Sequence, residues 1–245
     1  LNPVGVQACH IEGNFLNLLW RKTFNRSLNK CFDNAGIPIV EMYVTPLAMA
    51  EEILTEAEKC AGCMLVDLGA DTTTVAIYTR DILRHLFVLP LGSNNITKDL
   101  TTLKMEEREA EAMKLKYASA YTEVADIDDS MVWAIDSNRS VNSRLFIDVV
   151  EARVLEIIAN VWYLVPTEYT DKLLGGIILT GGGSNLKNID EAFRRHTHID
   201  KVRIAKFLPL NILPETAKIS IPHDGTMNGV ISILLKGDMN CAGND

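Results

Sequence analysis

The chain has 245 residues, of which 47% are hydrophobic and 23% are charged, a usage typical of packed globular proteins. This length suits one large domain or two small ones, and the composition excludes intrinsic disorder, collagen-like repeats and coiled coil. A formal net charge of −8 argues against nucleic acid as a partner, because surfaces that bind phosphate backbones need clustered Lys and Arg. No apolar run reaches the roughly 18 to 20 residues of a membrane span, and the first residues do not resemble a signal peptide.

The cysteines form an odd set without the spacing of a disulfide framework, which favours a reducing cytosol. They are Cys9, Cys31, Cys60, Cys63 and Cys241. Cys60 and Cys63 form a CxxC pair, but a zinc site needs a second pair or suitably spaced His residues. Because the pair lies where a helix is expected to end and a buried strand to begin, we favour a structural role for it.

The pattern between residues 45 and 89 predicts a helix followed by three strands. Apolar residues recur at helical spacing over 45–60, with Thr45 as the N-cap and Pro46 at the first helical position. The run 63–68 has the continuous apolar character of a strand buried on both faces. Residues 75–79 and 82–89 are typical of antiparallel strands joined by tight turns.

The rest of the chain alternates helices with a further strand. Helices are predicted over 94–103, 105–116 and 142–164, then a strand over 176–180 and helices over 185–196 and 226–236. The polar segment 118–139, with acidic residues at Asp126, Asp128 and Asp129, is predicted as an irregular or a β insertion. Strands mixed with helices and glycine-rich junctions indicate an α/β sheet layered by helices.

Residues 67–73, DLGADTT, place a carboxylate at the end of a buried strand and a tight turn directly after it. Backbone N–H groups in a glycine-containing turn can point at an anion, and threonine hydroxyls can add hydrogen bonds. An Asp beside them can hold Mg²⁺ through water. On this stretch alone, an ordinary hairpin with a capping Asp is an equally good interpretation.

A second glycine turn, Gly181 to Gly183, follows a predicted strand and precedes a predicted helix, where open α/β sheets bind ligands. A dinucleotide fingerprint needs a glycine at the sixth place, and this chain has Leu186 there. No P-loop motif occurs in the sequence. Three consecutive glycines indicate that something flat approaches the backbone closely.

Four motifs occur in order: DLGADTT at 67–73, PLG at 90–92 with NITKD at 95–99, AEAMKLKY at 110–117, and LTGGGSNL at 179–186. Together they resemble the actin-like ATPase superfamily, and within it the FtsA family of bacterial cell-division proteins. The resemblance spans most of residues 36–237. It implies an α/β, ribonuclease H-like ATPase lobe with a mixed sheet layered by helices and a smaller helical and β subdomain inserted.

The resemblance implies roles for the first phosphate-facing turn. Asp67 would position Mg²⁺ and water, and Gly69, Thr72 and Thr73 would contact the β- and γ-phosphates of ATP. The chain departs from the family pattern DIGGGTT at Ala70 and Asp71. A second carboxylate near the phosphates is repulsive, which weakens the expected binding.

The resemblance also implies an adenosine subsite. Glu111 and Lys114 would reach the ribose and base, and Gly181, Gly182 and Gly183 would lie against the adenosine. An alternative for the first two residues is a surface ion pair at i,i+3 spacing, worth a few tenths of a kcal/mol.

Catalysis is expected to be weak at most. Some related filament proteins carry Glu-Pro where this chain has Thr45-Pro46, and Thr is a poor general base. The family's first phosphate loop does not occur in the sequence, which opens on Leu1 rather than Met. We therefore expect a fragment that binds ATP weakly or not at all.

The resemblance implies a division into residues 1–35 (tail of an FtsA-specific subdomain), 36–62 (remnant of the first lobe), 63–93 with 148–245 (second lobe), and 94–147 (inserted subdomain). The implied function is a scaffold that links FtsZ filaments to the inner face of the cytoplasmic membrane at the division site. It would self-polymerise and contact other division proteins, with membrane attachment through a segment not found in this sequence. The alternatives are a sugar or acetate kinase of the same fold, and a protein-binding module without nucleotide.

Overall fold

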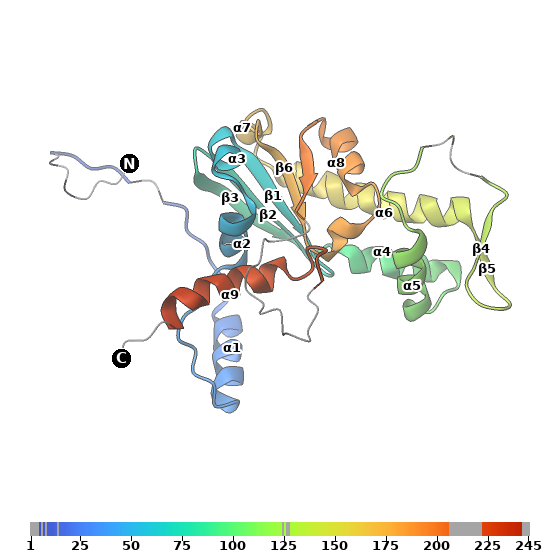
Figure 1. Cartoon of the computed structure of the whole chain (residues 1–245), viewed down its shortest axis with the longest axis horizontal. Coiled ribbons are helices and arrows are strands. Elements are labelled where there is room, and N and C mark those ends of the chain that lie inside the picture. Colours follow the sequence, from blue (N-terminus) through green and yellow to red (C-terminus); the bar gives the residue numbers. More distant parts are fainter. Residues whose placement is uncertain are drawn as a thin grey trace. The chain divides into compact units, whose positions relative to one another are not determined.

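The computed structural model describes residues 5, 7, 9–13, 15–123, 125, 128–205 and 222–241 (Figure 1). The chain divides into two compact units, Leu1–Met42 and Tyr43–Asp245. The first unit contains helix α1 (Lys22–Asn34), which buries none of its residues. No helix in the described ranges is long and apolar enough to cross a bilayer.

The second unit is built on a five-stranded mixed sheet in the order β3-β2-β1-β6-β7 (Figure 1). The strands are β1 (Cys63–Leu68), β2 (Thr73–Thr79), β3 (Ile82–Leu89), β6 (Gly176–Thr180) and β7 (Val202–Ile204). β1 pairs antiparallel with β2 and β2 with β3, whereas β1, β6 and β7 run parallel. The predicted strands are confirmed, and the short β7 is an addition.

The central strand β1 sends alternate side chains into two separate cores. Met64, Val66 and Leu68 belong to the core that α6 (Ser143–Leu164) and α8 (Ile189–Thr197) complete. Cys63 and Leu65 belong to the core with α2 (Thr45–Ile53) and α9 (Asn228–Cys241) on the other face. Helices on both faces explain why this strand is a continuous apolar run.

The predicted single helix over 45–60 is wrong, because the chain forms α2 and then α3 (Glu56–Ala61). Leu54 is extended, and Thr55 starts the new helix with a capping box. The Glu58 amide donates to Thr55 Oγ1 at 3.2 Å, and the Thr55 amide donates to Glu58 Oε2 at 2.9 Å. The signal was present in the sequence as T-x-x-E, inside a run of otherwise helical spacing.

The helices between residues 93 and 164 match their predictions closely. They are α4 (Ser93–Leu100) with a 3₁₀ turn (Thr101–Leu103), α5 (Glu107–Tyr117), and α6, which Asn142 caps by accepting the Leu145 amide at 3.1 Å. Within 118–139 and just beyond it, the β alternative is confirmed by a hairpin of β4 (Val132–Ala134) and β5 (Ser140–Asn142). Asp126 lies outside the described residues.

Two helix starts differ from prediction. The helix expected at residue 185 begins at Ile189, because a 3₁₀ turn (Gly182–Asn185) follows the glycines first. The last helix runs from Asn228 to Cys241, and a short α7 (Thr167–Thr170) was not predicted. In the CxxC pair, Cys63 is fully buried and burial raises the pKa of its thiol to about 12, whereas Cys60 is exposed.

An ion pair between buried Glu58 and partly exposed Arg203 ties the capping box to the edge strand β7 of the sheet. Arg203 on β7 donates from Nε and Nη2 to both carboxylate oxygens of Glu58, at 2.6 and 2.8 Å, and to the Ile53 carbonyl at 2.9 Å. Burial alone would raise the pKa of Glu58, but hydrogen bonds from Arg203 and Thr55 and the guanidinium charge lower it to about 2. The ionised carboxylate therefore stabilises the folded chain.

Glu58→Gln is expected to lower the free energy of unfolding at pH 7 by about 2 kcal/mol, the usual scale for hydrogen bonds to a charged group. Because the folded pKa lies below the ordinary value of 4.5, this stabilisation is present above pH 4.5 and disappears as the pH falls towards 2. Urea unfolding of both proteins across this pH range measures the difference. Glu56→Gln removes the same charge from the same helix without this pair, and an equal loss there would contradict the assignment.

Candidate functional site

A cleft of about 1030 Å³ opens at the edge of the sheet where β1 and β6 end. Its size is in the class that holds small molecules and cofactors. Its walls come from the end of β1, the starts of α2, α4 and α9, the face of α5, and the glycine turn after β6. Seven of the nine predicted nucleotide residues line it: Asp67, Gly69, Glu111, Lys114, Gly181, Gly182 and Gly183.

Asp67 stands at the centre of this edge, opposite Thr180 in the parallel register of β1 and β6. No hydrogen bond to its carboxylate is found among the described residues, and burial raises its pKa. A Cβ added to Gly181 would lie 2.3 Å from Asp67 Oδ1, so the carboxylate rests directly on the glycine backbone. A desolvated carboxylate facing a cleft is a candidate ligand for a cation.

The turn between β1 and β2 is compact and fixed to the start of α4. The Gly69 amide donates to the Thr72 carbonyl at 2.9 Å, closing the turn. The Ser93 and Asn94 amides donate to the carbonyls of Gly69 and Ala70 at 3.0 and 2.8 Å. A side chain at Gly92 would overlap the Ala70 carbonyl, which explains the glycine of the PLG motif.

The two predicted threonines lie beside the cleft rather than in its lining. Thr73 is fully buried and its hydroxyl donates to the Leu91 carbonyl at 2.8 Å. Thr72 is exposed in the turn. Asp71 is exposed too, and its carboxylate accepts a hydrogen bond from Asn94 Nδ2 at 3.0 Å, with Asn94 itself in the cleft wall.

The glycine turn packs tightly against the end of β1. Gly181 has a φ of +83°, and a Cβ on Gly183 would lie 2.9 Å from the Leu68 carbonyl. The Ser184 hydroxyl donates to the Gly181 carbonyl at 2.7 Å and holds the 3₁₀ turn. These contacts, rather than chain flexibility, require glycine at positions 181 and 183.

Glu111 and Lys114 form more than a surface ion pair. Lys114 is 7% exposed, and its ammonium contacts Glu111 Oε2 at 2.7 Å, Thr97 Oγ1 at 2.8 Å and the Ser93 carbonyl at 3.2 Å. Thr97 in turn donates to Glu111 Oε2 at 2.6 Å. Burial opposes ionisation of Glu111, but hydrogen bonds from Lys114 and Thr97 lower its pKa overall. The network joins α5 to α4.

Sequence reasoning missed several residues of the cleft wall. Leu115 is 78% exposed, and it lines the cleft together with Lys116, Tyr117 and Lys187. The start of α9 contributes Asp224, Gly225, Thr226 and Gly229. The position of Leu115 directly after Lys114 in the AEAMKLKY motif was the available signal for the first of these.

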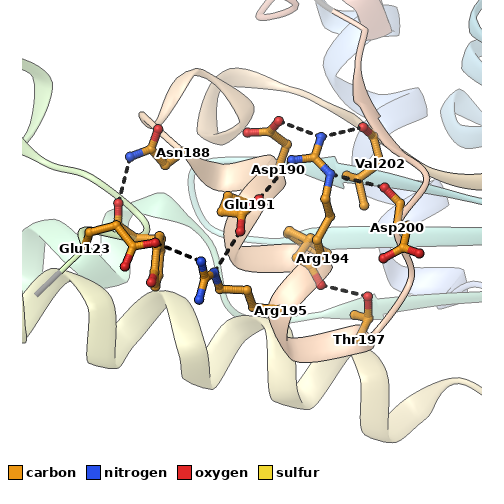
Figure 2. Close-up of polar contacts among 11 residues, drawn as sticks. Glu123, Asn188, Asp190, Glu191, Arg194, Arg195, Thr197, Asp200 and Val202 are labelled. Carbon is orange, nitrogen blue, oxygen red and sulfur yellow. Dashed lines mark hydrogen bonds and ion pairs between the residues drawn. The ribbon is translucent and has the colours of Figure 1, made fainter.

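Asn188 and the following helix α8 form polar contacts with residues 121–123 (Figure 2). Asn188 donates from Nδ2 to the Tyr121 carbonyl at 2.8 Å, and the Ala120 amide donates to the Lys187 carbonyl at 2.7 Å. Figure 2 shows Arg195 between Glu123 and Glu191. Its guanidinium also lies 4.1 Å from the centroid of the Tyr121 ring.

The other side of α8 is tied to the sheet. Arg194 reaches Asp190, the Asp200 carbonyl and the Val202 carbonyl, as Figure 2 shows. Because Val202 opens β7, the glycine turn, α8 and the sheet form one connected support for the cleft wall.

Comparison with solved structures defines the class of protein. The chain superposes on MreB5 of Spiroplasma citri bound to ADP with a TM-score of 0.64 at 15% identity, covering 91% of this chain and 69% of that one. It superposes on a MamK double helical filament with a TM-score of 0.58 at 15% identity, covering 89% and 66%. At this identity the likeness shows the fold, which is that of the actin-like ATPases, as predicted.

The family model of cell division protein FtsA matches residues 64–223. The cell division protein FtsA of Porphyromonas gingivalis is 32% identical over 192 residues, which are 76% of this chain and 40% of that protein. The chain belongs to the FtsA family. It spans 40 to 48% of the length of the first four curated relatives that it matches.

Gly181→Ala is expected to lower the free energy of unfolding by about 1 to 3 kcal/mol, because a side chain at this φ is strained and meets Asp67. Gly182→Ala is the matched control, since its Cβ meets only Thr226 Cγ2, at 3.3 Å. Urea denaturation of the two variants makes the comparison. Equal stability of the two variants would contradict the close approach of Asp67 to the glycine turn.

Asp67→Asn is expected to raise the melting temperature at neutral pH in the absence of ligand. Burial places the folded pKa of Asp67 above its ordinary value, so the ionised form costs folding free energy above that pKa and the cost is relieved as the pH falls through it. The gain from the variant should therefore shrink on acidification, measured by thermal melting. A constant gain at every pH would show that the charge is not its source.

Proposed function

We propose that the cleft binds ATP with Mg²⁺ and that the chain is the nucleotide-binding part of an actin-like cell-division scaffold. The observation that carries the proposal is the gathering of seven predicted residues, from three separate motifs, around one cleft. Membership of the FtsA family supports the scaffold over other uses of the fold.

The phosphate end of the ligand would lie on the turn after β1. Asp67 is assigned to Mg²⁺ through water, because its carboxylate is desolvated, lies in the cleft wall and has no partner among the described residues. Gly69 lines the cleft beside Asp67, and because its amide is bonded to the Thr72 carbonyl, its part would be to let the phosphates approach the turn closely. Since the Thr73 hydroxyl is engaged with Leu91, we assign Thr73 to shaping this turn, whereas the exposed Thr72 would contact the phosphates.

The adenosine would lie between α5 and the glycine turn. Gly181, Gly182 and Gly183 present a backbone surface without side chains. Leu115, on the facing helix α5, supplies an exposed apolar side chain. Lys114 acts by holding Glu111, whose side chain is 41% exposed and offers its second oxygen to a ribose hydroxyl. The base stacks against apolar surface while the sugar meets the polar network.

Hydrolysis in this proposal is weak at most. Thr45, at the start of α2, lines the cleft where a general base would face the attacking water. Its hydroxyl does not accept a proton readily near neutral pH. The nucleotide would then act by remaining bound and changing the conformation of the chain, rather than by being hydrolysed rapidly.

In the cell, this scaffold would link FtsZ filaments to the inner face of the cytoplasmic membrane at the division site and would self-associate. The family assignment supports the division role, and the shared fold with a MamK filament supports assembly. We keep the predicted subdomain boundaries, which follow residues 35, 62, 93 and 147, as part of this proposal.

Mg-ATP at a hundredfold excess over its Kd is expected to raise the stability of the chain by about 2.7 kcal/mol. Asp67→Asn should remove most of this increment, and Asp171→Asn, an exposed Asp at the end of α7, should not. Differential scanning fluorimetry with and without millimolar Mg-ATP gives the comparison.

The outcomes separate the candidate functions. No increment in the unmodified chain, up to nucleotide concentrations that saturate related sites, would overturn nucleotide binding and favour the module without nucleotide. An increment accompanied by ATP-dependent phosphorylation of a sugar or acetate would favour the kinase. An increment without phosphorylation, together with nucleotide-dependent co-sedimentation with FtsZ, is the expected result.

A further inference from the structure

An aromatic column leads from the cleft to the β4–β5 hairpin. Tyr117, in the cleft wall at the end of α5, stacks on Trp133 of β4 with ring centroids 4.5 Å apart and an interplanar angle of 5°. Trp133 meets Phe146 of α6 edge-on, at 5.3 Å and 80°. Phe146 is fully buried in the core, so it anchors the column.

A cation lies over the cleft end of this column. Lys116 Nζ is 4.7 Å from the centroid of the Tyr117 ring, and Lys116 lines the same cleft. No carboxylate pairs with Lys116 among the described residues, whereas the neighbouring Lys114 uses its donors inside the protein. Lys116 is therefore the ammonium of α5 that meets the Tyr117 ring at the adenosine end of the cleft.

The hairpin is fastened to α5 at a second place. Arg139, beside β5, pairs with Glu109 in the first turn of α5 and donates to the Lys104 carbonyl at 3.0 Å. Trp133 and Arg139 thus hold the hairpin to both ends of one helix. A movement of α5 carries the hairpin with it, because packed side chains shift together rather than deform.

The far end of α5 is bound to the other wall of the cleft. The chain continues from Tyr117 into residues 118–121, which hydrogen bonds join to Lys187 and Asn188 after the glycine turn. A ligand that contacts both α5 and the glycine turn therefore contacts the elements on either side of residues 118–121. Met131 and Val132, next to Trp133, are exposed apolar side chains at the outer end of the path.

We propose that occupancy of the cleft is relayed to the β4–β5 hairpin through the Tyr117–Trp133 stack. This inference rests on the proposed nucleotide binding. When the adenosine bears on α5, Tyr117 moves against Trp133, and the hairpin changes position relative to the sheet. Tyr117 is a positioning residue in this relay, acting on the hairpin through Trp133.

The test uses the whole chain labelled with 5-fluorotryptophan and observed by ¹⁹F NMR. Its tryptophans are Trp20, Trp133 and Trp162, and each resonance is assigned with the corresponding Trp→Phe variant. On addition of Mg-ATP, the Trp133 resonance is expected to shift with a midpoint equal to the Kd from calorimetry. Trp162, which packs on the same core but outside the column, is the internal control.

Two variants distinguish a relay from simple proximity, each measured at saturating nucleotide. Tyr117→Phe keeps the ring and is expected to keep the Trp133 shift, whereas Tyr117→Leu removes the stack and is expected to lose most of it. Calorimetric binding with an unmoved Trp133 resonance, or an undiminished shift in Tyr117→Leu, overturns the relay and leaves nucleotide binding intact. Absence of calorimetric binding overturns the proposed function and the relay with it.

Discussion

The site depends on one constraint, the parallel pairing of β1 with β6. This register sets Asp67 opposite Thr180 and delivers two turns, one after each strand, to the same edge of the sheet. The turns are separated by more than a hundred residues of sequence, yet the glycine backbone at 181 touches the Asp67 carboxylate. Every other part of the cleft is arranged around that contact: α4 closes the first turn, and α8 holds the second.

Burial of the Asp67 carboxylate at this contact lowers the free energy of unfolding when the group is ionised. Glu58 and Asp67 are both acidic residues of this unit, but their surroundings push their pKa values in opposite directions. Glu58 accepts hydrogen bonds from a guanidinium and from the Thr55 amide, so its charge stabilises the fold. Asp67 meets glycine and no donor among the described residues, so its charge is useful only to a ligand. A buried carboxylate without a partner among the described residues is a candidate binding position.

Much of the fold followed from the sequence because its elements have local causes. The strands 63–68 and 176–180 are short, apolar and bounded by glycine, and the spacing of Val150, Val154 and Ile157 defines α6 without reference to anything distant. The break at Thr55 and the late start of α8 at Ile189 were not recovered, because a capping box and a 3₁₀ turn compete with helical periodicity over only a few residues. The motifs gave seven predicted residues of the cleft lining, but Lys187 and the residues just before α9 enter it through tertiary contacts that no spacing reveals.

The distribution of charge in the cleft determines how a phosphate ligand could bind. The cations among its described lining residues are Lys114, Lys116 and Lys187, all on the side of α5 and the segment after the glycine turn. The ammonium of Lys114 is already bonded to Glu111 and Thr97. The turn after β1, where the phosphates would lie, instead carries Asp67 in the cleft wall and Asp71 just outside it. Backbone N–H groups alone do not offset two carboxylates near a polyphosphate, since like charges at short range oppose each other. In the proposed binding mode, a divalent cation at Asp67 would convert that repulsion into attraction, so the metal would contribute to the binding energy as well as to any hydrolysis.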